Sequence, residues 1–207
     1  MSYVRDPAAI YAQSFTTIRA EADLSGLPEA LHPLAIRMIH ASGMVDLAAD
    51  IVGTADLPRA VAEAVAAGAP VFCDCAMVRA GLITRDLSAH ADLRVTLNAD
   101  AVPALAARLG TTRSAAAVEL WRNDLAGAVV VIGNAPTALF HLLEMIEQGA
   151  PRPAAIIATP VGFVGAAESK DLLAAARHAI AFLTVRGRRG GSAIAAAGFN
   201  AALRGLS

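Results

Sequence analysis

The sequence predicts an α/β protein: a single domain over residues 1–207, with a doubly wound, mainly parallel, five-stranded sheet flanked by helices. Short apolar runs alternate with helical segments along the chain, as they do in βαβ units. The two clearest runs, residues 128–132 and 154–157, are apolar at every position, which is typical of strands covered on both faces. A helical N-terminal segment precedes the sheet.

The N-terminal helical segment is defined by residues that start and stop helices. Asp6 is a capping residue, and Pro7 suits a first helical turn because its missing N–H would be unpaired there. Ser42 and Gly43 end a second helix that begins near Pro33. The helices expected here are residues 8–23, a segment from 33 through 40, and residues 57–67, with an irregular piece at 51–53.

The remainder of the chain alternates strands with helices. The expected strands are residues 70–74, 93–97, 128–132, 154–157 and 181–185. The expected helices are residues 102–109, 113–121 and 137–148, one that begins near 168–170 and one after 192, with short helical or loop pieces at 77–81 and 83–85. Thr112 is the expected cap of the 113–121 helix, and Asn134, followed by Pro136, is the expected cap of the 137–148 helix.

Glycine-rich loops follow three expected strands, at residues 133–136, 159–165 and 186–192. The carboxyl ends of parallel strands meet at one edge of a sheet, where ligands bind in open α/β folds. Glycine lets the backbone approach a ligand closely, and Gly162 lies in the second of these loops. Each glycine also has a plain alternative role as a turn or a helix stop. We expect a ligand site at this edge.

Composition excludes two classes of protein. Hydrophobic residues make up 56% of the chain, but no run approaches the roughly 18 consecutive apolar residues that a bilayer span requires. A net charge of −1 argues against a general nucleic-acid binder. The first 15 residues show no basic segment followed by an apolar one. We therefore expect a cytoplasmic protein with no membrane and no nucleic-acid partner.

Several catalytic and cofactor motifs are missing from the sequence. Its five histidines have no metal-ligand spacing, and the glycine-rich segment 186–192 lacks the GK[ST] ending of a phosphate-binding loop. Residues 162–165 fall short of a dinucleotide fingerprint, and no GxSxG element is present. Cys73 and Cys75 are too close for an ordinary disulfide, so reduced thiols are expected. The histidines are His32, His40, His90, His141 and His178, of which His141 reads as a hydrogen-bonded core residue.

His40 is the titratable residue with a positional argument for function. It falls in the last turn of the second expected helix, where unpaired carbonyls stabilise a cation by about 0.3–1 kcal/mol. An imidazole in that position is a proton donor near neutral pH. A structural role is the alternative, and these patterns alone lead to an α/β enzyme or binding protein with loops suited to an anionic ligand.

The order of the motifs resembles that of the precorrin-8X methylmutase family. The motifs are RMIHASG at 37–43, FCD at 72–74 with Met77-Val78 and Thr84-Arg85, TRSAA at 112–116, GNAPTALF at 133–140, PVGFVGAAESK at 160–170 and RGRRGGSA at 186–193. The resemblance covers nearly the whole chain. Cys73-Asp74-Cys75 departs from the acidic or alanine residues that the family carries at that strand end.

The resemblance implies an isomerase of cobalamin biosynthesis that moves a methyl group from C-11 to C-12 of precorrin-8X, giving hydrogenobyrinic acid. It implies no external cofactor, no metal site, and a homodimer or other homo-oligomer with pockets near the subunit interface. His40 matches the family's general acid. The substrate-binding residues that it implies, together with those expected from the loops and helix starts, are Ser14, Arg37, Thr84, Arg85, Arg113, Asn134, Gly162 and Lys170.

Three alternatives to this function remain open from the sequence. The substrate is the cobalt-containing precorrin-8 in the first alternative. The second is a non-catalytic corrinoid-binding protein, and the third is a nucleotide-dependent oxidoreductase on the same scaffold. The sequence favours the isomerase because a methyl migration within one molecule needs neither a nucleophile nor a metal, only a shaped pocket with a proton donor.

Overall fold

The computed structural model describes residues 3–87, 92–175 and 179–204, and the described part contains one six-stranded sheet. His90 and His178 therefore lie outside the described residues. The strand order is β1-β6-β5-β4-β2-β3, and all neighbouring strands except β1 and β6 run parallel. The strands are β1 (Ile51–Gly53), β2 (Val71–Cys73), β3 (Leu93–Arg94), β4 (Val129–Ile132), β5 (Ala155–Ala158) and β6 (Ala181–Val185).

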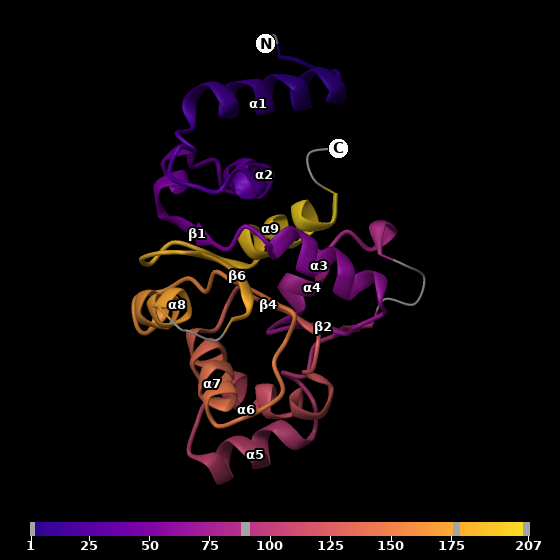
Figure 1. Ribbon diagram of the computed structural model, residues 1–207, viewed down its shortest axis with the longest axis vertical. Coiled ribbons are helices and arrows are strands. Elements are labelled where there is room, and N and C mark those ends of the chain that lie inside the picture. The colour runs from indigo at the N-terminus through magenta and orange to yellow at the C-terminus, as the bar shows by residue number, and fades with distance from the viewer. Residues whose placement is uncertain (1–2, 88–91, 176–178, 205–207) are drawn as a thin grey trace.

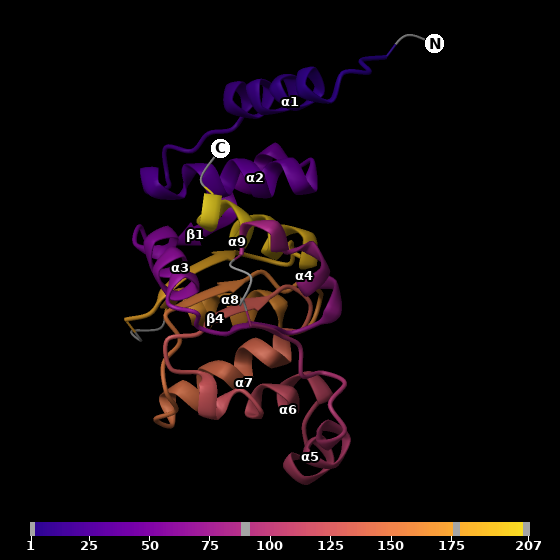
Figure 2. The same cartoon turned by 90° about the vertical axis from the view of Figure 1, so that its right-hand side faces the viewer.

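Helices cover both faces of the sheet, so the predicted α/β class is confirmed (Figures 1 and 2). Helices α2, α3, α4 and α9 lie on one side, and α6, α7 and α8 lie on the other, with α1 and α5 outside these layers. The helices are α1 (Pro7–Glu21), α2 (His32–Ser42), α3 (Leu57–Ala66), α4 (Ala76–Gly81), α5 (Ala101–Leu109), α6 (Arg113–Glu119), α7 (Pro136–Glu147), α8 (Ala166–Ala175) and α9 (Ser192–Arg204). Short 3-10 turns include η2 (Val45–Asp50) and η3 (Thr84–Asp86).

The sheet has one strand more than the sequence predicts. Residues 51–53, expected to be irregular, form β1, which pairs antiparallel with β6. Three residues are too few to show a periodic pattern, and their pairing depends on residues at least 130 positions away. Strand β3 is shorter than the expected 93–97 because Thr96 turns towards α6: its hydroxyl donates to the Ala117 carbonyl at 2.9 Å.

Alternate residues of the central strands enter two separate cores. Val129 and Val131 of β4 pack with α2, α3 and α9, whereas Val130 and Ile132 pack with α6 and α7. This is the two-residue alternation of a strand, here with apolar side chains on both faces. The apolar run at 128–132 predicts this two-sided burial correctly.

Local capping follows the sequence at three of the four helix ends considered. Asp6 accepts the Ala8 N–H at 3.1 Å, Thr112 accepts the Ala115 N–H at 3.2 Å, and Gly43 ends α2 in the left-handed region at φ 68°. The expected cap at Asn134 is wrong. Ala135 occupies the cap position of α7 and makes no side-chain cap bond.

Within the described residues, no helix combines the length and the apolarity that crossing a bilayer requires. Helix α1 lies outermost, against α2 (Figure 2). Only Phe15 and Ile18 of α1 are buried, while Ile10 and Tyr11 are exposed. The outer helix therefore leaves an apolar surface uncovered near the N-terminal end of the chain.

Candidate functional site

A cavity of about 540 Å³ lies between α1 and α2, and Ser14 and His40 both line it. The volume is within the range of small-molecule pockets. The other lining residues, half of them aliphatic and half polar or glycine, come from α1, the end of α2 and the start of η2: Ile10, Gln13, Thr17, Ile18, Glu21, Ile39, Gly43 and Val45. The packing of α1 on α2 thus unites two residues that the sequence analysis selected separately.

The His40 ring is exposed at the end of α2 and faces the aromatic side chains of α1. Its centroid is 4.9 Å from that of Phe15 and 6.4 Å from that of Tyr11. Arg37, one turn earlier on α2, places its guanidinium carbon 5.2 Å from the Tyr11 centroid and 4.9 Å from the Phe15 centroid. An accessible imidazole can exchange a proton with a ligand, and the neighbouring guanidinium favours a ligand that is anionic.

Thr84 lines a second cavity of about 460 Å³, together with Arg79, Asn98 and residues of α4 and the β3 region. Arg113 lies next to it, because its Nη2 donates to the Asn98 side-chain oxygen at 3.1 Å and to the Leu97 carbonyl at 3.3 Å. Arg113 is the first residue of α6, where free backbone N–H groups could help its guanidinium to bind a carboxylate. In the structure Thr112 already accepts the Ala115 N–H of that helix start.

The loop at Asn134 is held by a carboxylate that the sequence analysis missed. Asp74 is only 4% exposed, and it accepts the backbone N–H groups of Gly133 at 3.1 Å, Asn134 at 2.9 Å and Ala135 at 2.8 Å. These are the amide groups that an anionic ligand would otherwise find at the start of α7. An acidic residue directly after a buried strand, next to a strand that ends in Gly-Asn, is the signal that could have identified it.

Gly162, in the loop after β5, and Lys170, on α8, both bond to the loop that follows β6. The Gly162 N–H donates to the Arg188 carbonyl at 3.2 Å, and the buried Lys170 amine donates to the Arg189 carbonyl at 2.6 Å. Burial lowers the pKa of Lys170 to about 8, against the opposing charges of Asp171 and Asp50. Among the described residues that line the His40 cavity, neither Gly162 nor Lys170 occurs.

Arg189 connects this loop to the segment that follows the His40 helix. Its guanidinium donates to the carboxylates of Asp46, at 2.7 Å, and of Asp50, both in η2. The sequence predicts a ligand site at the strand-end loops, and the resemblance implies that His40 is its general acid. The structure differs, because helices form the His40 cavity and the strand-end loop supports it through η2.

Neither cysteine is placed to act as a nucleophile. Burial, followed by the charge of Asp74, raises the pKa of Cys73 to about 12, so its thiol stays protonated at neutral pH. Cys75 lies 3.6 Å from the Ser192 hydroxyl, and both cysteines are buried and unbridged. Within the described part of the chain, no group of three or more His, Cys, Asp or Glu residues is arranged to hold a metal.

His141 is hydrogen-bonded, as expected, since its Nε2 donates to Glu119 at 2.8 Å.

Comparisons with known proteins give one consistent family. The family model described as precorrin-8X methylmutase matches residues 9–204. The chain is 56% identical to the precorrin-8X methylmutase of Pseudomonas aeruginosa, covering 97% of each chain. It is 34% identical to the cobalt-precorrin-8 methylmutase of Priestia megaterium, covering 94% of this chain and 86% of that protein. A solved precorrin-8X methylmutase from Thermus thermophilus superposes with a TM-score of 0.84, at 34% identity over 95% of each chain.

Proposed function

The chain belongs to the precorrin-8X methylmutase family, and from this premise we propose that it is an isomerase of cobalamin biosynthesis that converts precorrin-8X into hydrogenobyrinic acid. The reaction moves a methyl group from C-11 to C-12 of the macrocycle. The observation that carries the proposal for the site is the His40 imidazole, exposed in a cavity that Ser14 also lines. The family relationship supports the isomerase role, and the cavity supports the proposed location of the reaction next to His40.

In the proposed mechanism His40 is the general acid. Its imidazolium donates one proton to the bound ring and so selects the tautomer from which the methyl group migrates. The bond from the methyl group to C-11 breaks as the bond to C-12 forms, within the same molecule and without net oxidation. The proton then returns from the ring to the imidazole, which restores the enzyme. A positioned acid of this kind accelerates a reaction by about 10²- to 10⁴-fold.

The substrate's acetate and propionate carboxylates need cationic and N–H donors. Arg37 lies one turn from His40, and Arg85 follows Thr84, which lines the second cavity. Arg113 borders that second cavity through Asn98. We assign to these residues, with Ser14, the binding of the ring's periphery, because guanidinium groups pair with carboxylates in a bidentate geometry.

We propose that Asn134, Gly162 and Lys170 support the loops of the site and do not touch the ring. The Asn134 N–H is bonded to Asp74, the Gly162 N–H to the Arg188 carbonyl, and the Lys170 amine is fully buried. In this proposal Gly162 and Asn134 contribute to substrate binding indirectly, by holding the conformation of their loops. Lys170 takes the role of a loop anchor in this proposal.

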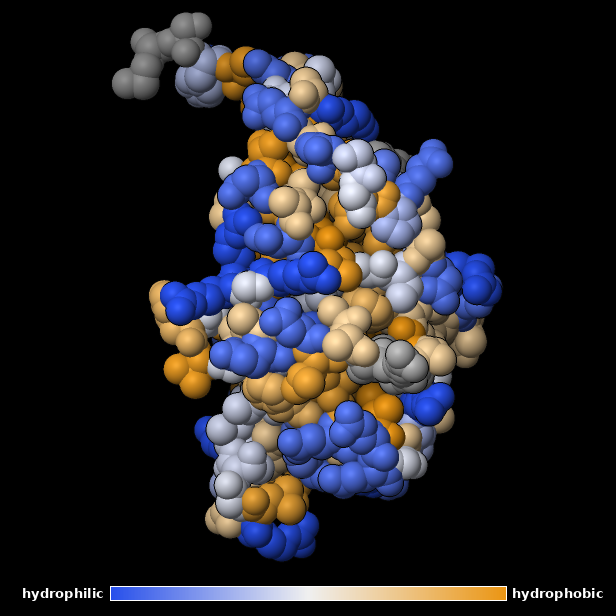
Figure 3. Space-filling model, turned by 60° about the vertical axis from the view of Figure 1, so that its left-hand side comes forward, coloured by the Kyte–Doolittle hydropathy of each residue, from blue (hydrophilic) through white to orange (hydrophobic). Residues whose placement is uncertain are grey.

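A second copy of the chain is the proposed cover of the cavity. Helix α1 leaves Ile10 46% and Tyr11 41% exposed, and Ile10 lines the cavity itself. On the face that Figure 3 shows, hydrophobic surface interrupts hydrophilic surface near α1, at the top of the molecule. A homodimer that buries this apolar surface is supported by the hydrophobic effect. We place the protein in the cytoplasm, where precorrins are the small-molecule partner.

The test is turnover of precorrin-8X, followed by the absorption spectrum, because the migration changes the chromophore. We expect the wild type to convert the substrate and His40→Ala to bind hydrogenobyrinic acid without converting precorrin-8X. Gln13→Ala is the matched control, since it alters the same cavity without removing a titratable group. Undiminished turnover by His40→Ala rejects the role of His40, and binding without turnover by the wild type identifies a carrier instead.

Cobalt-precorrin-8 is the second candidate substrate. The identities of 56% and 53% to precorrin-8X methylmutases, against 34% to a cobalt-precorrin-8 methylmutase, favour the metal-free ring. Parallel assays with the two substrates decide between them, and faster turnover of the cobalt-containing ring overturns this preference. Titration with NAD(P)H, with no binding expected at millimolar concentration, tests the oxidoreductase alternative.

A further inference from the structure

The loop that follows β5 carries the two most exposed large apolar side chains of the described residues. Phe163 is 83% exposed and Val164 is 88% exposed, and the neighbouring Val161 is 47% exposed. We name Val161, Phe163 and Val164 the loop tip. A cluster of exposed apolar side chains on a globular protein is typical of a surface that binds a partner.

The loop tip is held in place by the rest of the chain. The Gly162 N–H donates to the Arg188 carbonyl at 3.2 Å, and the Ser169 N–H of α8 donates to the Gly165 carbonyl at 3.0 Å. The Arg188 guanidinium carbon lies 5.3 Å from the centroid of the Phe163 ring. An aromatic ring and an arginine that are already ordered lose little conformational entropy on binding, and both types are enriched among the residues that dominate protein–protein interfaces.

A third cavity, of about 560 Å³, lies between the end of α1, η2 and β1. Its lining includes the aliphatic residues Leu27, Val45 and Ile51. Glu21 and Asp23, both exposed, supply negative charge to the lining, and we name this hollow the acidic cavity. Because Glu21 and Val45 also line the His40 cavity, the two cavities adjoin.

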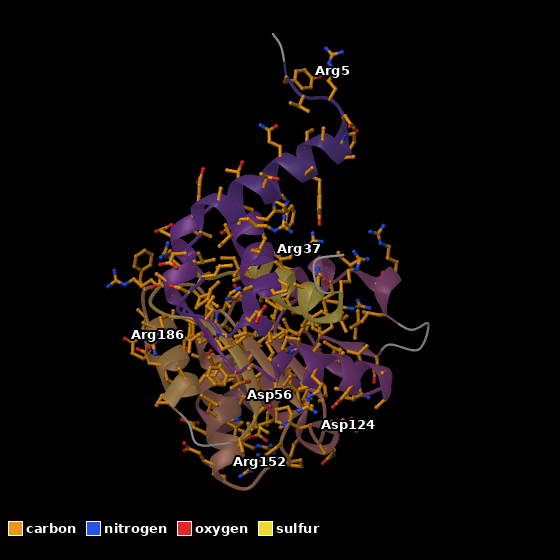
Figure 4. The ribbon with its side chains drawn as sticks, turned by 45° about the horizontal axis from the view of Figure 1, so that its top comes forward. Arg5, Arg37, Asp56, Asp124, Arg152 and Arg186 are labelled. Carbon is orange, nitrogen blue, oxygen red and sulfur yellow. The ribbon has the colours of Figure 1, made fainter. Side chains whose placement is uncertain are left out.

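The loop tip and the acidic cavity lie on one side of the molecule. The Arg186 N–H donates to a carbonyl of η2 at 2.8 Å, and the Arg189 side chain binds Asp46, which lines the acidic cavity. Figure 4 shows Arg186 on the left of the molecule, on the side at which α1 ends. The loops at 159–165 and 186–191 contain three arginines and no acidic residue, so their charge is opposite to that of the cavity.

We propose that the loop tip of one copy of the chain docks in the acidic cavity of a second copy, whose own loop tip docks in return. A two-fold dimer requires such a self-complementary surface, on which the same two features meet twice. Because the acidic cavity adjoins the His40 cavity, each loop tip borders the candidate site of the other copy. The inference rests on the proposed function for the role of the dimer, and it deepens that function by naming the surface through which the second copy covers the site.

Burial and charge both favour this docking. A phenylalanine side chain buries about 150–250 Å², and docking in both directions removes two of these rings from water. Arg188 flanks the Phe163 ring, so it arrives at the cavity beside the carboxylates of Glu21 and Asp23. Complementary charge of this kind fixes the orientation of two surfaces on each other.

The experiment measures the dimer dissociation constant of the full-length protein by sedimentation over a dilution series. The wild type should dimerise, and Phe163→Asp should raise the dissociation constant about 30-fold to 1000-fold, the effect of losing a dominant interface residue. Met77→Asp is the matched control and should leave the constant unchanged, since Met77 is 69% exposed on α4, across the sheet from α8. Val164→Asp replaces Phe163→Asp if the latter does not fold. A monomeric wild type, or a tip variant that dimerises as tightly as the wild type, overturns the inference.

An exchange of charges tests whether the loop tip and the acidic cavity face each other. Ala49 is exposed and lines the acidic cavity, so Ala49→Arg should also weaken the dimer by obstructing it. In the double variant Phe163→Asp/Ala49→Arg, the introduced carboxylate and guanidinium pair across the interface. Its dimer should therefore be at least about tenfold tighter than the two single losses predict when they are added. Losses that add fully place the two positions apart and reject the docking.

A membrane surface is the other candidate partner for an apolar tip beside arginines. Cosedimentation with vesicles of phosphatidylcholine and phosphatidylserine tests it, and neither the wild type nor Phe163→Asp should bind. Vesicle binding by the wild type that Phe163→Asp abolishes would assign the loop tip to lipid and overturn the inference.

Turnover of precorrin-8X distinguishes failure of the docking from failure of the proposed function. Turnover per subunit by Phe163→Asp should fall with the fraction of dimer and recover at protein concentrations at which the variant dimerises. If the wild type dimerises through the loop tip without converting precorrin-8X, the proposed function fails and the docking stands. If the wild type converts precorrin-8X and Phe163→Asp leaves the dimer unchanged, only the docking fails.

Discussion

The amine of Lys170 donates a hydrogen bond to the backbone carbonyl of Arg189 at 2.6 Å from a fully buried position. A lysine in the first half of a helix thereby fixes the loop after β6. The side chain of Arg189 then binds Asp46 and Asp50, next to the helix that carries His40. One buried amine thus begins a chain of contacts that ends at η2, the turn that follows the helix carrying His40.

Lys170→Met is expected to remove a pH dependence from the free energy of unfolding. The pKa of Lys170 is about 8 in the folded protein and 10.5 in the unfolded chain. Between these two pH values the unfolded chain therefore binds more protons than the folded protein. Wild-type stability should therefore gain up to about 3 kcal/mol as pH rises from about 8 to 10.5, because the cost of burying a charge disappears. Urea unfolding across this pH range measures the difference. Parallel profiles for the two proteins would contradict the burial of a charged amine.

Asp74→Asn is expected to destabilise the protein by about 2–5 kcal/mol, since one amide oxygen replaces a carboxylate that accepts three N–H groups. Amide exchange at Gly133, Asn134 and Ala135 should accelerate more than elsewhere. Asp6→Ala is the control, because Asp6 accepts one N–H at an exposed helix start and should cost about 1 kcal/mol. Unchanged exchange in the loop would reject Asp74 as its anchor.

Glu119→Gln is expected to lose stability at neutral pH but not in acid. Burial raises the pKa of Glu119, but the hydrogen bonds from Arg122 and His141 outweigh it, so the net pKa lies below 4.5. A carboxyl group with a lowered pKa contributes stability above its unfolded pKa and loses it as pH falls through the folded value. Thermal unfolding at neutral and acidic pH should show the two proteins converging in acid. A constant difference at every pH would count against this ion pair.

Gly133→Ala is expected to destabilise the protein by about 1–3 kcal/mol through overpacking. A Cβ there would lie 2.6 Å from the Ser192 Cα and 2.8 Å from a methyl group of Val78, and the Ser192 backbone cannot move without shifting the start of α9. Gly26→Ala is the matched control, because a Cβ at Gly26 meets nothing within 4 Å. Chemical denaturation of the three proteins provides the comparison, and equal midpoints for all three would mean that the approach is not tight.

The sequence predicts those features of the fold that are determined by residues close together in the chain. Asp6, Thr112 and Gly43 cap helices through atoms a few residues away, and the buried strands are visible as continuous apolar runs. The carboxylate of Asp74 instead bonds to N–H groups about 60 residues away. Local propensity therefore predicts Asn134 as the cap of α7, whereas Ala135 occupies the cap position. Contacts of that length depend on the register of two strands, which no local pattern contains.

In the candidate site, too, some features are determined locally and others by contacts between distant residues. The helix-end position of His40 follows from its own segment, because Gly43 stops α2. Its sharing of a cavity with Ser14 depends on how α1 lies across α2. The attachment of the Gly81–Ile83 segment to α9 depends on Asn200, which bonds to residues nearly 120 positions away. Local patterns along the sequence do not encode such contacts.

The pairing of β1 with β6 has a consequence for how the protein folds during its synthesis on the ribosome. Ile51 meets Val185 in the sheet, and α2 packs against a helix that starts at residue 192. At a synthesis rate of about 5–20 residues per second, the N-terminal third therefore waits roughly 7–27 s for its partners to emerge. During that interval the side of α2 that packs on α9 has no partner from its own chain, so this apolar surface stays open to contacts with other molecules.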